Sequence, residues 1–185
     1  LYPREQGIDI LTFSGHKIHG PKGIGGLYIK KETNISPMVY GGNQEKGLRS
    51  GTENVPGIVG MGKAVEIINN NFEDKKKYIM NLKKYLYKNI KSNIPRIKIN
   101  SLLDNNFSPY ILNISFLGVK GEVLLHFLED RGIYVSTGSA CSSHGQGKSY
   151  VLTAIGLSNE EIDGAIRFSL SHFNTKEDID YVVRK

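Results

Sequence analysis

SGHKIHGPKG, residues 14–23, lies between two apolar runs that read as strands, Ile8 to Phe13 and Leu27 to Ile29. A hydroxyl, an imidazole and a lysine amine gather where the first strand ends, and the glycines with Pro21 predict a turn of the backbone there. The lysine of this turn is a candidate covalent catalyst, because burial lowers a lysine pKa and frees the amine to attack a carbonyl. A lysine after a strand is more often a solvated charge, so the stretch alone leaves both interpretations open.

Three further stretches accompany this turn: GGNQEKGLRSGTEN at 41–54, STGSACSS at 136–143 and AIRFSL at 165–170. In their order and separation, the four stretches resemble the NifS/IscS-like cysteine desulfurases, which belong to the class V aminotransferase family of pyridoxal-phosphate (PLP) enzymes. The resemblance covers essentially all 185 residues and corresponds to the C-terminal half of such an enzyme.

The resemblance implies an α/β chain with the PLP-dependent transferase (aspartate aminotransferase-like) fold. Residues 1–57 are expected to form the end of the large PLP-binding domain, and residues 58–185 the small C-terminal domain. A helical region over about 57–93 is expected to link the two domains.

The resemblance also assigns residues to the cofactor, pyridoxal 5'-phosphate. Lys17 is expected to bind PLP covalently and to move protons at the substrate Cα. Ser14 and His16 match residues that bind the cofactor phosphate, a dianion that needs several donors. Thr52 matches a threonine that reaches the partner's cofactor in a homodimer, so within one chain it is expected to lie away from Lys17.

Cys141 is the second catalytic candidate. A lone cysteine is usually a small buried apolar residue, but Cys141 has serine and glycine neighbours that indicate an exposed loop, where a thiol can become a nucleophilic thiolate. The resemblance implies that Cys141 takes sulfur from L-cysteine as a persulfide. The sulfur then passes to an acceptor such as an iron–sulfur scaffold protein, or to tRNA or cofactor thiolation. Whether His144 assists Cys141 stays open.

Arg167 lies on the polar face of an alternating strand, and its guanidinium fork suits a carboxylate. By resemblance it pairs with the substrate carboxylate, and a structural ion pair is the alternative. Arg49 and Glu53 form either an ion pair that stabilises the loop or part of the site. Lys22 is expected to shape the turn rather than to bind phosphate.

Other functions remain open. A selenocysteine lyase or an aminotransferase is a related possibility, and a non-catalytic domain that accepts sulfur or binds a partner is another. The family's residues for the cofactor ring and the pyridine nitrogen lie upstream of the first strand. The isolated chain is therefore expected to bind PLP weakly and not to desulfurate cysteine.

Composition limits the class of protein. One cysteine excludes an intrachain disulfide framework and a multi-cysteine metal site, and it favours a reducing, cytoplasmic location. No apolar run reaches the ~20 residues that span a bilayer, and no signal peptide is visible, although the chain begins at Leu1 and a targeting signal can precede it. The net charge of +6 is attributed mainly to a solvated helical face whose lysines include Lys83. Nucleic-acid binding is the weaker interpretation of this charge, because no nucleic-acid recognition motif is present.

Local patterns predict the remaining elements. Residues 57–93 show helical spacing with a break near residue 70, and Pro95 follows. Strands are expected at 96–99, 110–116, 133–135 and 165–171, with a short strand or strand edge at 38–40. Helices are expected at 121–130 and 148–155, after the Ser158 capping box, and after Thr175.

Overall fold

The computed structural model describes residues 2–104, 107–137 and 149–185. Its elements in chain order are β1 (Ile10–Ser14), η1 (Gly15–Ile18), β2 (Gly25–Ile29), η2 (Gln44–Gly47), α1 (Val55–Asn69), α2 (Phe72–Asn93), β3 (Ile97–Ile99), β4 (Ile111–Phe116), α3 (Gly121–Glu129), α4 (Tyr150–Ala154), α5 (Asn159–Asp163), β5 (Ala165–Ser169) and α6 (Lys176–Arg184). The chain forms two compact units, which divide between Phe72 and Glu73 and are described separately.

The first unit contains a β-hairpin, in which β1 and β2 pair antiparallel from Ile10 opposite Ile29 to Ser14 opposite Gly25. Phe13 stands opposite Gly26, where an added Cβ would collide with the phenyl ring. This pair explains why a glycine is needed in the strand. The predicted strand before the SGHKIHGPKG turn is confirmed, although it begins at Ile10 rather than Ile8.

Two helices replace the single helical region expected at 57–93, and the predicted break near residue 70 is confirmed. Helix α1 starts after Asn54, whose side chain accepts a hydrogen bond from the Gly57 amide at 3.1 Å. Between the helices, Asn71 adopts a left-handed conformation with φ of 58°, which an asparagine tolerates better than most residues.

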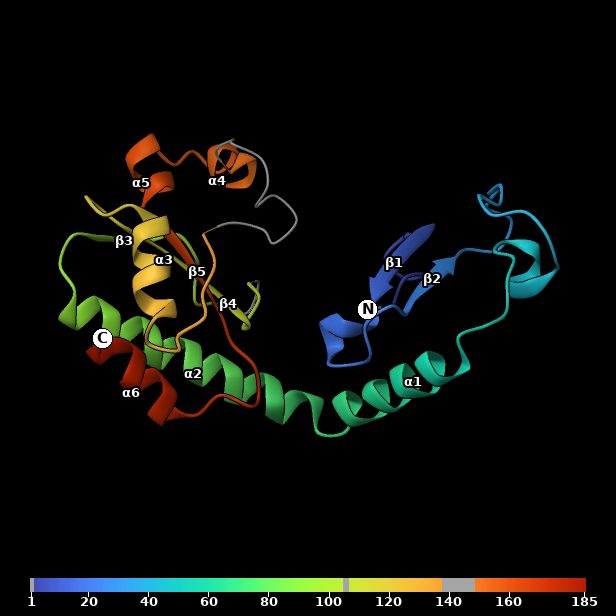
Figure 1. Ribbon diagram of the computed structural model, residues 1–185, viewed down its shortest axis with the longest axis horizontal. Coiled ribbons are helices and arrows are strands. Elements are labelled where there is room, and N and C mark those ends of the chain that lie inside the picture. Colours follow the sequence, from blue (N-terminus) through green and yellow to red (C-terminus); the bar gives the residue numbers. More distant parts are fainter. Residues whose placement is uncertain (1, 105–106, 138–148) are drawn as a thin grey trace. The chain divides into compact units, whose positions relative to one another are not determined.

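The second unit is built on an antiparallel sheet with the strand order β3-β4-β5. Helices α2 and α6 lie together along one side of this sheet, and α4 and α5 lie on the other (Figure 1). The strand alternation predicted for β4 and β5 is confirmed, because their apolar positions pack with α2 and α6 in one core. The buried members of that core are Ile79, Leu82, Leu86, Ile90, Leu112, Ile114, Phe116, Ile166, Phe168, Leu170 and Ile179.

Side-chain caps fix the ends of the short helices. Ser158 and Glu161 form the predicted capping box at the start of α5, and Thr175 and Asp178 form a second one at α6. Gly132, at φ of 72°, follows α3 in the left-handed conformation that glycine commonly adopts after a helix. A small second cluster, of Leu152, Ile162 and Ala165, joins α4 and α5 to the sheet.

Two expectations are wrong. Residues 133–135 form no strand, and only Ser136 makes a single antiparallel bridge, to Arg167. Lys83 is not solvated but fully buried, because carbonyl groups of the 101–109 loop replace water around its ammonium group. At 38–40 the chain makes one parallel bridge, from Val39 to Arg49.

The mixed α/β class is confirmed by this arrangement of sheets and helices. Within the described part of the chain, no helix combines the length and apolar character needed to cross a membrane.

Candidate active site

The SGHKIHGPKG turn is closed by its own backbone. The Gly15 amide donates to the Ile24 carbonyl at 2.8 Å, and the Gly20 amide donates to the Gly15 carbonyl at 2.9 Å. Gly15 is buried, and an added Cβ would lie 3.0 Å from the Ile24 side chain. The backbone of the turn therefore folds inward at Gly15, while His16 and Lys17 stay exposed.

Helix α1 supports this turn from within the same unit. Gly60 faces Pro21 so closely that a Cβ would lie 2.6 Å from the proline ring. A Cβ on Gly20 would lie 3.4 Å from the Ala64 side chain. Two glycines thus let the turn and the helix approach, and the helix holds the turn in place.

The structure brings Ser14, His16 and Lys17 together at the end of β1 and in η1. A hydroxyl and an imidazole are donors that suit a phosphate, and an exposed primary amine suits an aldehyde. These residues fit the phosphate and the aldehyde of PLP. The turn therefore carries the kinds of group that the phosphate and the aldehyde of PLP would need.

The 41–54 loop is folded on itself. The buried Ser50 donates from Oγ to the Gly42 carbonyl at 3.0 Å, and the Gly51 amide donates to Gln44 Oε1 at 3.2 Å. Arg49 donates from Nη1 to the Ser50 carbonyl at 2.6 Å. Among the described residues no ion pair joins Arg49 to Glu53, so a loop-stabilising pair of these two is not observed.

Thr52 is exposed and does not share the Lys17 turn. It precedes α1 at Val55, whereas the turn contacts α1 at Gly60 and Ala64, about 8 Å and about 14 Å further along the axis at about 1.5 Å per residue. In Figure 1 the segment between η2 and α1 lies at the opposite end of the helix from η1. The two candidate cofactor residues are therefore separated within one chain.

Arg167 lies in the second unit, in β5, on the face opposite the apolar core. Its backbone pairs with Ser136, donating to the Ser136 carbonyl at 2.6 Å. Among the described residues Arg167 makes no ion pair, and its Nε is buried without a hydrogen-bond partner. The structural ion pair considered as its alternative role is thus not observed there. Cys141 and His144 lie outside the described residues.

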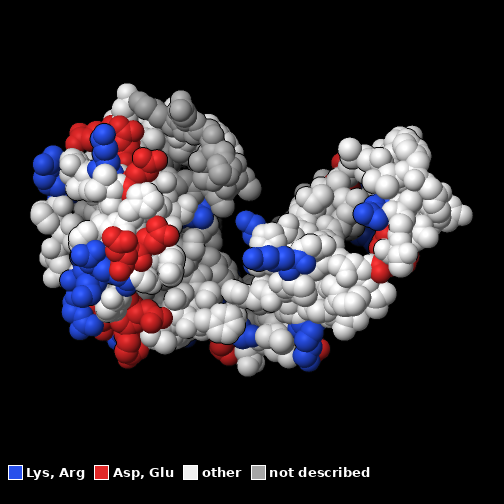
Figure 2. Space-filling view, viewed as in Figure 1, with Lys and Arg blue, Asp and Glu red and all other residues white. Residues whose placement is uncertain are grey.

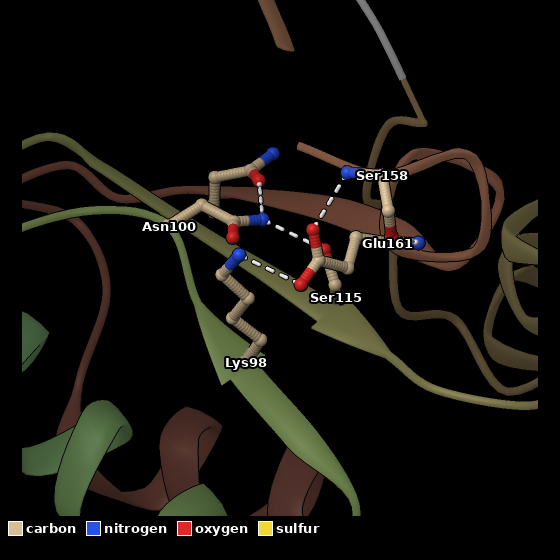
Figure 3. A network of polar contacts seen from close by, with 6 residues as sticks. Lys98, Asn100, Ser115, Ser158 and Glu161 are labelled. Atoms are coloured by element: carbon tan, nitrogen blue, oxygen red, sulfur yellow. Dashed lines mark hydrogen bonds and ion pairs between the residues drawn. The ribbon is translucent and has the colours of Figure 1, made fainter. Parts of the chain in front are cut away.

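Polar residues beside Arg167 were missed in the sequence. Asn100 donates from Nδ2 to Asn113 Oδ1 at 2.7 Å and to Ser115 Oγ at 2.8 Å (Figure 3). Asn113 and Ser115 occupy the polar face of β4, so the strand's alternation was the available signal. The alternation could not show which residue of a neighbouring strand lies opposite Asn113 and Ser115.

An ion pair lies next to this network. Lys98 Nζ is 2.7 Å from Glu161 Oε1, and Glu161 also accepts from the Ser158 amide at 2.7 Å (Figure 3). The hydrogen bond from Lys98, followed by that from Ser158, lowers the pKa of Glu161 below its ordinary value. The pair joins the start of α5 to β3 and stabilises the edge of the polar face.

Charges of both signs are mixed over the visible face of the second unit (Figure 2). Nucleic-acid binding by electrostatics requires a basic patch or stripe rather than alternating signs. The visible face therefore favours the solvated-surface interpretation of the net charge of +6.

Comparisons with known proteins show which family the chain is similar to. The family model described as aminotransferase class-V matches residues 1–182. Cysteine desulfurase IscS of Clostridium botulinum is 45% identical over 181 residues, which cover 97% of this chain and 46% of that protein. The NifS-like protein from Rickettsia africae superposes with a TM-score of 0.86 at 34% identity, covering 98% of this chain and 47% of the other. A structure titled SspA in complex with cysteine superposes with a TM-score of 0.69 at 32% identity, covering 94% of this chain and 47% of the other.

The chain thus spans about half the length of the curated relatives that it matches. The solved relatives have the α/β fold of PLP-dependent cysteine desulfurases, and the expected fold is confirmed. Since the family model matches residues 1–182 of the 185, the chain belongs to the aminotransferase class-V family and is related to the cysteine desulfurases.

Proposed function

We propose that this chain is the C-terminal half of a PLP-dependent cysteine desulfurase. The observation that carries the proposal is the glycine-closed turn after β1, which presents an amine, an imidazole and a hydroxyl together at Lys17, His16 and Ser14. Relatives named cysteine desulfurase and a relative solved with cysteine support L-cysteine as the substrate. We place the domain boundary near residue 57, with α1 and α2 as the link.

Each site residue has a distinct role in this proposal. Lys17 holds PLP and moves a proton at the substrate Cα, while Ser14 and His16 hold the cofactor phosphate. Arg167 binds the substrate α-carboxylate through its guanidinium fork. When bound, PLP supplies the electron sink that makes bonds at the substrate Cα and Cβ labile.

Cys141 receives the sulfur. Its thiolate attacks the substrate sulfur, so that an S–S bond forms as the substrate Cβ–S bond breaks. The electron pair of the broken bond stays with the carbon, which takes a proton and becomes the methyl group of alanine. The products are alanine and a Cys141 persulfide, and the persulfide passes sulfur to an iron–sulfur scaffold protein or to tRNA or cofactor thiolation in the cytoplasm.

A chimera tests the proposal, with this chain replacing the matching half of the Clostridium botulinum relative. Borohydride reduction of the PLP-loaded chimera should fix the cofactor to the peptide that contains Lys17, and Lys17→Arg should abolish the adduct. Lys22→Arg in the same turn is the matched control and should keep it. An adduct spread over surface lysines would contradict the assignment of Lys17.

Cys141→Ser separates cofactor binding from sulfur transfer. The chimera with this substitution should keep the PLP spectrum but lose cysteine-dependent alanine formation and the persulfide. Desulfuration that continues at the original rate would exclude Cys141 as the sulfur acceptor. The unaltered 185-residue chain should be inactive, and sulfide release by it alone would overturn the idea that another half completes the site.

We propose a homodimer in which Thr52 contacts the cofactor phosphate held by the partner chain. The separation of Thr52 from η1 supports this arrangement. Lys17→Ala and Thr52→Ala chimeras should each have little activity. Heterodimers formed by mixing the two should regain up to half of the activity of the unaltered dimer, because one of the two sites then carries neither substitution. No recovery in heterodimers verified by mass spectrometry would contradict the shared site.

A further inference from the structure

Helix α1 is apolar on two opposite sides. One side packs on the SGHKIHGPKG turn of the same unit, where Ala64 lies against Gly20. Gly62 is two residues from Ala64, or about 200° around the axis at about 3.6 residues per turn, so it lies on the side away from the turn. Exposed apolar residues flank Gly62 at spacings of three and four, which form one row along a helix. This row, the outer stripe, consists of Val55, Ile58, Val59, Gly62 and Val65.

The composition of α1 suits a covered helix. A helix that is apolar around most of its circumference is normally buried. The charged residues of α1 are Lys63 and Glu66, and they form an ion pair with each other at 2.6 Å. Val59 is 65% exposed and Val55 is 59% exposed. Because the outer stripe runs for about 15 Å at about 1.5 Å per residue, it is a contiguous apolar patch, which marks a contact surface.

Gly62 lies in the middle of this patch. No atom lies within 4 Å of the place where a Cβ on Gly62 would be. An alanine would therefore fit in this chain, and alanine is the better helix former. A glycine in this position lets another backbone approach the helix closely. Gly62 thus suits an element that packs across the outer stripe.

The hairpin of the same unit also needs a cover. Among the described residues β1 and β2 pair only with each other, and two strands alone are marginally stable in water. Phe13 in β1 and Leu27 in β2 are each nearly half exposed. Since apolar surface remains on both the hairpin and α1, the cover must have the size of a domain rather than of a short peptide.

We propose that the outer stripe is the surface on which the preceding half of the enzyme packs. The inference rests on the proposed function, in which this chain is the C-terminal half. More than half of the Clostridium botulinum relative lies outside the match, which covers 46% of that protein, so a polypeptide of sufficient size is available.

A second copy of the chain fits the outer stripe less well. The stripe lies on the side of α1 away from the SGHKIHGPKG turn. If two stripes packed together, the partner's turn would lie behind the partner's own α1, beyond a helix about 10–12 Å across. Thr52 could not reach the partner's cofactor in that arrangement. The proposed homodimer therefore uses another surface and leaves the outer stripe for the preceding half.

Labelling of an introduced thiol tests this docking surface. Val59→Cys in a Cys141→Ser background places a single thiol on the outer stripe. A maleimide should label it rapidly in the 185-residue chain, and at least about 100-fold more slowly in the PLP-loaded chimera, because a covered thiol reacts only through local opening. Glu129→Cys in the same background is the matched control, since Glu129 is exposed in the second unit. Its rate should differ less than about threefold between the two proteins.

Three results would overturn the proposal. Equal labelling rates of Val59→Cys in the two proteins would show that the preceding half does not cover the stripe. Slow labelling already in the 185-residue chain would mean that another part of this chain covers it. Protection in the chimera that disappears when the dimer is diluted to monomers would assign the cover to a second copy.

The borohydride adduct at Lys17, measured on the same chimera, separates this inference from the proposed function. An adduct at Lys17 together with an unprotected Val59→Cys removes only the docking surface. Protection of Val59→Cys without an adduct removes the PLP role of Lys17 and keeps the docking surface.

Stability gives a second measurement that needs no labelling. Val59→Asp should lower the thermal midpoint of the chimera by about 5 °C or more, because it buries an unpaired carboxylate, and should shift that of the 185-residue chain by less than about 2 °C. Lys63→Ser, on the flank of the stripe, is the control and should shift both by less than about 2 °C. Equal shifts in the two proteins for Val59→Asp would contradict the proposal.

Discussion

Replacing Lys83 by methionine tests whether a buried charge holds the second unit together. Lys83 lies in α2 with no exposed surface, and its Nζ donates to the carbonyls of Leu102 and Ser108, both at 2.9 Å. Methionine keeps most of the apolar stem and removes the ammonium group. Two carbonyls of the 101–109 loop then lose their donor, so we expect the loop to separate from α2.

The magnitude follows from two opposing effects. Two hydrogen bonds from a charged donor contribute roughly 1.5–3 kcal/mol each, or about 3–6 kcal/mol together. Removing a buried ammonium relieves a desolvation cost of several kcal/mol, which offsets part of this loss. We therefore expect Lys83→Met to lower the free energy of unfolding by about 2 kcal/mol.

Urea unfolding at pH 7, followed by circular dichroism and by hydrogen exchange in the β4 strand, measures this change. Lys84→Met is the matched control, since the neighbouring lysine is exposed, and it should change stability by less than about 0.5 kcal/mol. An increase in stability in Lys83→Met would refute the reasoning, because the desolvation cost would then exceed the hydrogen bonds.

The pH dependence gives an independent check. Burial lowers the pKa of Lys83, and the nearby Asp104 opposes this effect. Between the folded pKa and the ordinary value, the unfolded chain binds more protons, so stability of the native protein rises with pH in that window. The free energy of unfolding of the native protein should therefore exceed that of Lys83→Met by a growing amount as pH is raised toward the ordinary lysine pKa. A difference that shrinks with pH would contradict the sign of the shift.

Two further predictions concern Glu161 and helix α1. Folding lowers the pKa of Glu161, so its carboxylate contributes to the free energy of unfolding above the unfolded pKa of about 4.3. This stabilisation is lost as pH falls through the folded pKa. Acid titration should therefore destabilise the native chain relative to Glu161→Gln. In a Lys98→Met background, the stability difference between Glu161 and Glu161→Gln should depend less on pH. A pH dependence that persists there would exclude Lys98 as the main cause of the lowered Glu161 pKa. In α1, Gly60→Ala should lower the thermal midpoint by crowding Pro21, an overpacking cost of about 1–3 kcal/mol that outweighs a helix-propensity gain of about 1 kcal/mol. Gly62→Ala, with open space around it, should raise the midpoint, and the same sign at both glycines would show that Pro21 does not restrict Gly60.

Much of the local structure could be predicted because its causes lie within a few residues. The Ser158–Glu161 box connects positions three apart and forms as expected, and a helix starts after Thr175 as expected, with a second box to Asp178. The chemistry of the SGHKIHGPKG turn was equally local, since Ser14, His16 and Lys17 share one hairpin connection. Their roles at the cofactor stay predictions that the chimera tests.

Lys83 shows why other parts could not be predicted. It lies between Leu82 and Leu86 on the apolar stripe of α2, a spacing that indicated burial, but the composition of the helix favoured solvation. Its partners come from 19 and 25 residues away, so only the folded loop determines that the ammonium group has acceptors.

Short-range signals in the sequence were sufficient to predict the turn that carries Lys17 and most of the helices and strands, because hydrogen-bond caps, glycine turns and apolar alternation act over short separations. Contacts in the folded chain determine that Ser136 makes one bridge where a strand was expected at 133–135, and that Asn113 lies opposite Arg167 in the strand register. Strand register and the burial of a charge depend on contacts between distant segments, and these contacts exist only once the sheet and its helices have packed.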